Sequence, residues 1–173
     1  MDKYHVVGHS LPQIDGRERA SGAAEFVSDM KLPGMLYGRI LRSPHPHARI
    51  RHIDTSKARR LPGVKAVVTV QDTPQIPFGP RTDDWMIMAL DKVRFVGDEV
   101  AGVAAVDEDT AEEALSLIEV EYDPLPAVFD PLEAMQPGAP LIHDKERNIV
   151  SEFKLAKGDV EKAFQESDVV HGD

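Results

Sequence analysis

The sequence predicts an α+β domain in which short strands form a small mixed sheet and a few short helices cover one face. Val64–Val70 is rich in β-branched residues, which is typical of a buried strand. Ala48–Asp54 alternates apolar and charged residues, as a half-exposed strand does. After Asp107, apolar residues recur at helical spacing, at Ala111, Ala114, Leu115 and Ile118. Strands alternating with helices favour a layered domain of this class.

Composition excludes several classes of protein. The 173 residues include 30 acidic and 20 basic side chains, a formal charge of −10, and no cysteine. Without cysteine the chain has no disulfide framework and no thiolate for zinc or an iron–sulfur cluster. An acidic chain without a basic block disfavours binding to nucleic acid or anionic lipid. No apolar run is long enough for a membrane span and the first residues are not a secretion signal, so we expect a cytoplasmic protein.

The first half of the chain begins with a polar stretch and then gains strands. Residues 1–35 scatter glycines among charges, which predicts extended or looping chain. Leu36–Arg42 reads as a strand, and the paired prolines of Ser43–Pro46 close it with a turn. A short helix to Arg60 is predicted after the strand at Ala48–Asp54, ending at Pro62-Gly63.

The second half contains a long loop, a predicted hairpin and a helix. Residues 72–90 hold three prolines and the only tryptophan, and loops this long in a compact domain are usually functional or form interfaces. We expect Val93–Val96 and Val100–Val106 to pair as a hairpin around Gly97-Asp98. The helix from Asp107 is followed by a strand that alternates Ile118, Val120 and Tyr122 with acidic residues. Beyond it we expect a strand at 149–155, a helix at 159–166 and a further strand at 169–173.

Few residues suggest chemistry by themselves. His45-Pro46-His47 has the spacing of a metal chelate, but a rigid turn or interface loop explains it better. Asp83-Asp84 beside Trp85 could line a pocket or form a solvated loop tip. Asp98-Glu99 reads as a turn, with a general base as the alternative. No phosphate-binding loop, dinucleotide-binding turn or serine elbow is present, so we assign no catalytic, cofactor-binding or metal-ligating residue.

An ordered series of motifs resembles a known family. The motifs are Gly38–Ile50, Ile53–Ser56, Leu61–Val64, Asp91–Asp98, Ala111–Leu115, Val120–Tyr122 and Leu125-Pro126, with Asp15-Gly16, Ser21–Ala24 and Ser28-Asp29 before them. In order and content they resemble the first part of the molybdenum-binding large subunit of the xanthine dehydrogenase and aldehyde oxidase family. Asp72–Pro74, Pro77–Gly79 and His143-Asp144 are most similar to the large subunit of 4-hydroxybenzoyl-CoA reductase.

The resemblance implies a domain plan and a set of partners. Residues 36–130 would form an α/β hammerhead domain, preceded by an extended segment at 1–35. Residues 131–173 would be a linker and the first elements of the molybdopterin-binding domain, cut from the rest. The expected partners are the remaining molybdopterin-binding domains, an iron–sulfur subunit and an FAD subunit, with no nucleic acid or membrane. Molybdopterin with molybdenum, iron–sulfur clusters and FAD would belong to the parent complex, with none bound by this chain alone.

The resemblance also implies a function for the long loop. The parent enzyme would hydroxylate, or reductively dehydroxylate, an aromatic or heteroaromatic substrate or an aromatic acyl-CoA, with redox chemistry supplied by its cofactors. The chain would be a scaffold that lines substrate access, for which we name Phe78, Arg81 and Trp85; sealing an interface between subunits is the alternative for this loop. Since fold does not fix function, a free-standing interaction or ligand-binding module is the alternative for the chain.

Overall fold

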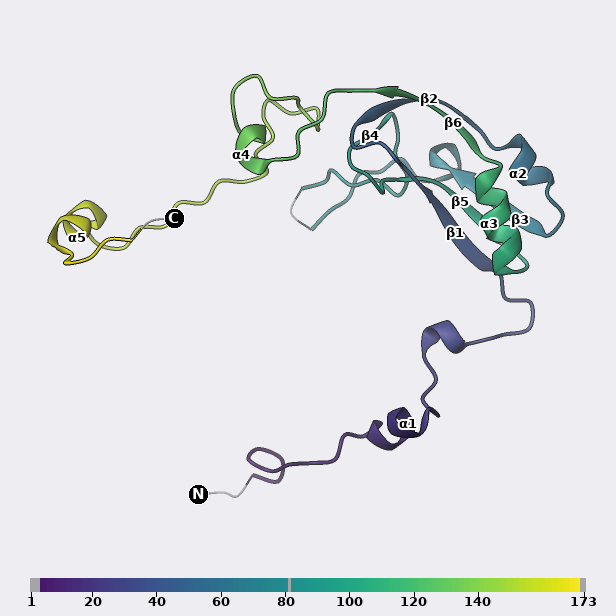
Figure 1. Ribbon diagram of the computed structural model, residues 1–173, viewed down its shortest axis with the longest axis horizontal. Helices are drawn as coiled ribbons and strands as arrows, with labels where there is room; N and C mark the ends of the chain where they lie inside the picture. The colour runs from purple at the N-terminus through teal and green to yellow at the C-terminus, as the bar shows by residue number, and fades with distance from the viewer. Residues whose placement is uncertain (1–3, 81, 172–173) are drawn as a thin grey trace. The chain divides into compact units, whose positions relative to one another are not determined.

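The computed structural model describes residues 4–80 and 82–171 (Figure 1). The chain divides into two compact units, Met1–Leu36 and Tyr37–Asp173. The first unit holds the helix α1, Gly16–Ser21, and the 3₁₀ turn η1, Val27–Asp29. None of its described residues is buried. The polar, glycine-containing sequence explains this, because it offers too little apolar surface to form a core.

The second unit contains two antiparallel sheets of three strands each. The first has the order β1-β5-β3, in which β5 is Glu99–Ala105 and its neighbours are β1, Tyr37–Arg42, and β3, Val64–Thr69. The second has the order β4-β2-β6, in which β2 is Ala48–Asp54. Its edge strands are β4, Lys92–Val93, and β6, Glu119–Pro124. The pairings in both sheets are antiparallel.

Helices cover one side of the first sheet. The helix α2, Ser56–Arg60, contacts β3, and α3, Glu108–Ser116, packs against β1, β5 and β3 (Figure 1). The predicted cap of α3 forms, since the Asp107 carboxylate accepts a hydrogen bond of 2.7 Å from the amide of Thr110. The buried face of α3 carries Ala111 and Ala114. The predicted α+β class is confirmed.

Two buried clusters hold the sheets and helices together. One joins α2 and α3 to the first sheet and contains Ala58, Val67, Ala101, Val103, Ala114 and Ile118. The other joins the second sheet to β5 of the first and contains Ala48, Ala89, Val93 and Val100. Ile53 and Val120 pack against both clusters, so the two sheets share one continuous apolar interior.

The predicted hairpin at 93–96 and 100–106 is wrong. The strand β4 pairs with β2, whereas β5 pairs with β1 and β3 in the other sheet. The turn between β4 and β5 is hydrogen-bonded to Ser43, in the connection between β1 and β2. The Ser43 amide donates to the Asp98 carbonyl, and the Gly97 amide donates to the Ser43 carbonyl, each at 2.9 Å. These bonds direct the two strands into different sheets.

The predicted strands near the end of the chain do not form. Residues 149–155 and 169–171 have no strand structure, and Gly172 and Asp173 lie outside the described residues. Two helices occur in this part. The helix α5, Val160–Glu166, was expected, while the short α4, Pro131–Ala134, was not. No helix among the described residues has the length and hydropathy needed to cross a membrane.

Candidate functional site

The long loop between β3 and β4 begins with the 3₁₀ turn η2, Val70–Asp72, and then folds back on itself. Phe78 and Trp85 form an antiparallel bridge in which each amide donates to the other's carbonyl, at 3.0 and 2.9 Å. Gly79 fits the turn beyond the bridge for a steric reason. A Cβ atom at this position would lie 1.9 Å from the carbonyl oxygen of Thr82. We call residues 76–80 and 82–87 the aromatic ribbon.

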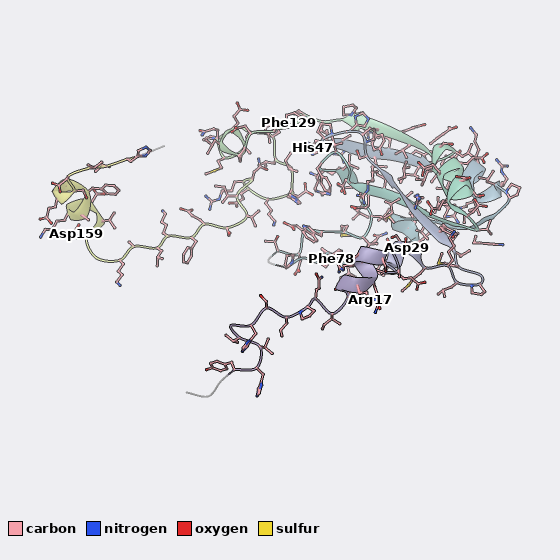
Figure 2. All side chains as sticks on the ribbon, turned by 60° about the horizontal axis from the view of Figure 1, so that its bottom comes forward. Arg17, Asp29, His47, Phe78, Phe129 and Asp159 are labelled. Carbon is pink, nitrogen blue, oxygen red and sulfur yellow. The ribbon has the colours of Figure 1, made fainter. Side chains whose placement is uncertain are left out.

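One face of the aromatic ribbon is apolar and exposed. The rings of Phe78 and Trp85 meet edge to face, with centroids 6.0 Å apart, and the two residues remain 45% and 56% exposed. Phe78 is labelled in Figure 2. Ile76 and Ile87, two positions away on each side, are also exposed. Since alternate residues of an extended chain share a face, these four side chains form an apolar surface that suits an aromatic or other apolar group.

The predicted access residues are therefore only partly brought together. The structure places Phe78 and Trp85 against each other, and Arg81 lies outside the described residues. Their role in substrate access stays a prediction.

The other face of the aromatic ribbon is polar and carries Asp84. Its side chain is 14% exposed, accepts a hydrogen bond of 2.7 Å from the Thr82 hydroxyl and lies 3.4 Å from the Lys145 ammonium. The Thr82 hydrogen bond, and then Lys145, hold the pKa of Asp84 below its usual value. Asp84 also lines a cleft of about 260 Å³, which confirms the pocket-lining interpretation for Asp84, whereas Asp83 is exposed.

Residues 128–150 supply the opposite wall of this cleft. Asn148 organises that segment: its side-chain oxygen accepts from the amide of Ile142 at 3.0 Å, and its nitrogen donates to the carbonyls of Ala134 and Pro140 at 3.1 and 2.8 Å. His143 lines the same cleft, and burial, followed by the charge of Arg94, lowers its pKa. No periodic pattern of residues indicates this arrangement, because isolated side-chain hydrogen bonds shape the segment.

The histidine pair has two separate environments. His45 packs against the ring of Tyr122 with centroids 4.8 Å apart. His47 is 5% exposed, and its Nδ1 lies 2.7 Å from the carbonyl oxygen of Pro126. The two rings thus have different partners. Over residues 4–80 and 82–171, no group of three or more His, Asp or Glu side chains is arranged to hold a metal ion.

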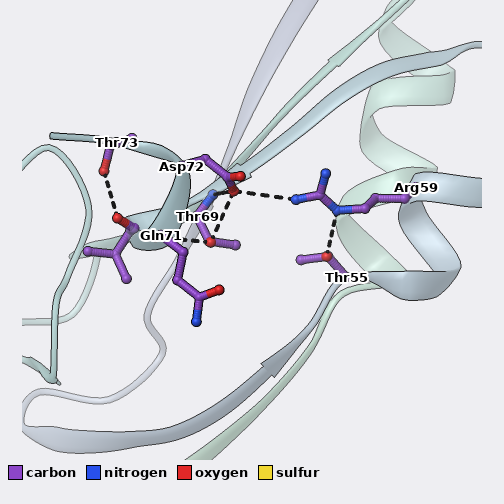
Figure 3. Close-up of polar contacts among 7 residues, drawn as sticks. Thr55, Arg59, Thr69, Gln71, Asp72 and Thr73 are labelled. Atoms are coloured by element: carbon purple, nitrogen blue, oxygen red, sulfur yellow. Dashed lines mark hydrogen bonds and ion pairs between the residues drawn. The ribbon is translucent and has the colours of Figure 1, made fainter.

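A polar cluster at the start of the loop is structural (Figure 3). One carboxylate oxygen of Asp72 accepts from the amide of Thr69 at 2.9 Å and from the Thr69 hydroxyl at 3.2 Å, and Arg59 donates to it at 3.3 Å. The amide of Thr69 is the largest cause of the lowered pKa of Asp72. Arg59 also donates to the Thr55 hydroxyl. These contacts fasten η2 to α2 and fix where the loop begins.

Asp98, for which a general base was the alternative, holds the turn before β5. Its carboxylate accepts a hydrogen bond of 2.8 Å from the amide of Arg94. Burial raises the pKa of Asp98 above its usual value. This hydrogen bond joins residues close in sequence, as expected for the predicted turn. Glu99 forms an ion pair of 2.6 Å with Arg42.

Comparison with known proteins identifies relatives that match most of the chain. Residues 21–126 match the family model described as aldehyde oxidase and xanthine dehydrogenase, a/b hammerhead domain. The chain is 42% identical over 147 residues to the carbon monoxide dehydrogenase large chain of Afipia carboxidovorans, covering 83% of this chain and 18% of that protein. It is 39% identical over 168 residues to the nicotinate dehydrogenase large molybdopterin subunit of Eubacterium barkeri, covering 96% and 39%.

A solved structure shows the same fold. Quinoline 2-oxidoreductase from Pseudomonas putida 86 superposes with a TM-score of 0.85 at 33% identity, over 96% of this chain and 22% of that one. The chain thus spans well under half the length of each of these relatives.

Proposed function

The chain belongs to the aldehyde oxidase and xanthine dehydrogenase family through its a/b hammerhead domain, and on this basis we propose that it is the N-terminal part of the large subunit of a molybdenum-dependent oxidoreductase. The match over residues 21–126 carries this proposal. In the proposed assembly, the chain is a scaffold between the remaining molybdopterin-binding domains and the iron–sulfur and FAD subunits. The proposed location is the cytoplasm.

We propose no cofactor ligand among the residues of this chain. The sequence has no cysteine, so thiolates for iron–sulfur clusters have to come from other chains or domains. The described residues also contain no group of three or more His, Asp or Glu side chains placed to bind a metal ion. We therefore assign no step of the redox reaction to this chain.

The proposed contribution of the chain to the reaction is the aromatic ribbon. Its exposed pair, Phe78 and Trp85, offers ring faces and edges to an aromatic or heteroaromatic substrate on its way to the active site. Arg81, which lies between them in the sequence, would attract the negative charge of an acidic substrate. The motifs at Asp72–Pro74, Pro77–Gly79 and His143-Asp144 support an aromatic acyl-CoA as one such substrate, reductively dehydroxylated; hydroxylation of an aromatic ring is the other direction.

Metal analysis and kinetics test the proposal at two levels. The purified 173-residue chain should contain no molybdenum or iron and show no turnover, and stoichiometric molybdenum in it would contradict the scaffold role. In the complete complex, Trp85→Ala should raise KM about fivefold with a smaller change in kcat, because a ring that only guides substrate contributes mainly to binding.

The matched control is Phe95→Ala, which removes a similarly exposed ring (54%) from the turn between β4 and β5. An equal rise in KM for Phe95→Ala, or no change for Trp85→Ala, would refute the access role. A complex that fails to assemble with Trp85→Ala, but assembles with Phe95→Ala, would show that the aromatic ribbon seals an interface between subunits.

A further inference from the structure

Three basic side chains gather on one face of the second sheet. His47 directly precedes β2 and lies two residues before Arg49, which lies directly opposite Lys92 of β4. Residues at that spacing on an extended chain, and residues opposite each other across strands, project from the same face. Like charges placed opposite each other across a sheet destabilise it. No sequence motif predicted that Arg49 and Lys92 lie opposite each other.

These basic side chains line an open cleft of about 440 Å³. Its remaining wall is apolar and comes from the 125–126 and 138–141 segments, including Leu125, Pro126 and Leu141. The cleft therefore has a cationic end and an apolar side. This combination suits a ligand that joins an acid group to an apolar body.

The basic groups retain unused hydrogen-bonding capacity. The Lys92 side chain is only 9% exposed, and the hydrogen bond described for its ammonium is the one of 3.1 Å to Asp144. An ammonium has three donors. Arg49 forms no ion pair within the described part of the chain, and the Asp123 carboxylate, which lies opposite Arg49 on β6, is bonded to Arg51 instead.

The orientation of His47, labelled in Figure 2, leaves one further buried atom without a partner. A carbonyl oxygen only accepts hydrogen bonds, so Nδ1 of His47 carries the proton that it donates to Pro126. This bond fixes the ring. Its Nε2 atom is buried and has no partner among the described residues. An orphaned buried nitrogen of this kind is uncommon in native proteins and calls for an explanation.

The charge balance selects the kind of anion. Arg49 and Lys92 bring two positive charges, and Asp144 neutralises one of them, so these three side chains leave a single positive charge at the cleft. A monoanion compensates that charge, whereas a phosphate dianion would exceed it. Arg also binds a carboxylate through two parallel hydrogen bonds.

From these observations we propose that the cleft beside His47, Arg49 and Lys92 binds a monoanionic organic acid, with the carboxylate at Arg49 and Lys92 and the apolar body along Leu125 and Leu141. The proposal is independent of the redox function, since it rests on the sheet register and on the cleft. It gives the buried Lys92 a ligand partner, whereas Nε2 of His47 only accepts hydrogen bonds while Nδ1 carries the proton, so His47 lines the cleft without bonding the carboxylate.

Titration of the 173-residue chain with hexanoate, followed by calorimetry and by the NMR signals of the His47 ring, tests the proposal. We expect saturable binding of hexanoate and at least about tenfold weaker binding of the neutral hexanamide, because the charge-assisted hydrogen bonds are lost. Acetate should bind more weakly than hexanoate, because it lacks the apolar body, and Leu141→Ser should lower the affinity for hexanoate alone. Inorganic phosphate should bind more weakly than hexanoate.

Two exposed arginines provide matched variants. Arg49→Gln should weaken hexanoate binding about tenfold, while Arg60→Gln, which removes the same charge from α2 outside the cleft, should change it less than about twofold. Equal losses in the two variants would reduce the effect to net charge and overturn the site. Equal binding of hexanamide, tighter binding of phosphate, or unchanged His47 signals would also overturn it.

Discussion

Residues 37–126 and residues 151–171 use similar apolar side chains with opposite results. In the first region Val93 and Val100 are fully buried between paired strands. In the second region every residue is exposed, including Phe153 at 85% and Val169 at 83%. Hydrophobicity was thus necessary for a core but not sufficient, because a strand completes its backbone hydrogen bonds only when a neighbouring strand is present.

Helices do not share this requirement, and α5 forms in the exposed region. Its backbone bonds lie within the segment, and the Asp159 carboxylate, labelled in Figure 2, accepts from the amide of Lys162 at 3.0 Å. None of its residues is buried. Local signals therefore establish short helices, whereas strands depend on residues distant in the sequence.

The largest expected effect is on the free energy of unfolding, when valine is replaced by alanine in each of the two regions. Val100→Ala should lower the free energy of unfolding by about 2 kcal/mol, because it removes two methyl groups' worth of packing and leaves a cavity in the core. Val169→Ala should change it by less than about 0.5 kcal/mol, since the side chain contacts little. Urea denaturation of both variants measures the two values.

A similar loss for Val169→Ala would show that the exposed region packs against something in solution. Light scattering at several concentrations would then identify association between chains, because stability that depends on protein concentration indicates an oligomer.

Removing the N-terminal caps of α3 and α5 should have a smaller effect on stability, which again differs between the two regions. Asp107→Ala should lower the melting temperature by about 2–4 °C, because α3 is part of the cooperative core and loses its N-terminal cap. Asp159→Ala should leave the melting temperature unchanged and reduce only the helical circular dichroism, since α5 carries no buried residue. Equal shifts in melting temperature would place α5 within the cooperative unit.

The sequence predicted the elements whose pattern is local. Ala48–Asp54 was predicted to the residue, the strand at 64–70 to within one residue, and α3 together with its Asp107 cap. The fold class and the family followed from these elements and from the motifs around His45 and Asp91–Asp98. The two three-stranded sheets did not follow, because sheet partners are chosen by contacts between distant segments.

The wrong hairpin shows this most directly. Val93 and Val100 lie on either side of a glycine turn, which is the usual signal for a hairpin. The contacts of that turn with Ser43, far earlier in the chain, send the strands to different sheets. Of the candidate site, Phe78, Arg81 and Trp85 were predicted together as access residues. The contact between the rings of Phe78 and Trp85 was not predicted, and Arg81 lies outside the described residues. The roles of Asp84, Asn148 and the Arg49–Lys92 register depend on tertiary contacts that no periodicity encodes.

Residues 128–150 lie between the two regions in sequence, and charged contacts attach them to the core. Lys145 pairs with Asp84, and Asp144 pairs with Lys92. His143 makes this attachment sensitive to pH. Its pKa is lowered in the folded chain, so below its ordinary value of 6.5 the unfolded chain binds more protons. Stability contributed by neutral His143 is therefore present above that value and is lost as the pH falls through the folded pKa.

The smallest expected effect is thus a change in the pH dependence of stability. His143→Gln should reduce the loss of melting temperature between about pH 7 and about pH 5 by roughly 1–3 °C. Lys145→Gln should reduce it less, because the charge of Lys145 lowers the pKa of His143 only after burial and Arg94. Asp84→Asn should increase the loss, because Asp84 raises that pKa. Equal slopes in wild type and all three variants would mean that residues 128–150 are detached in solution, so that the exposed region begins soon after β6.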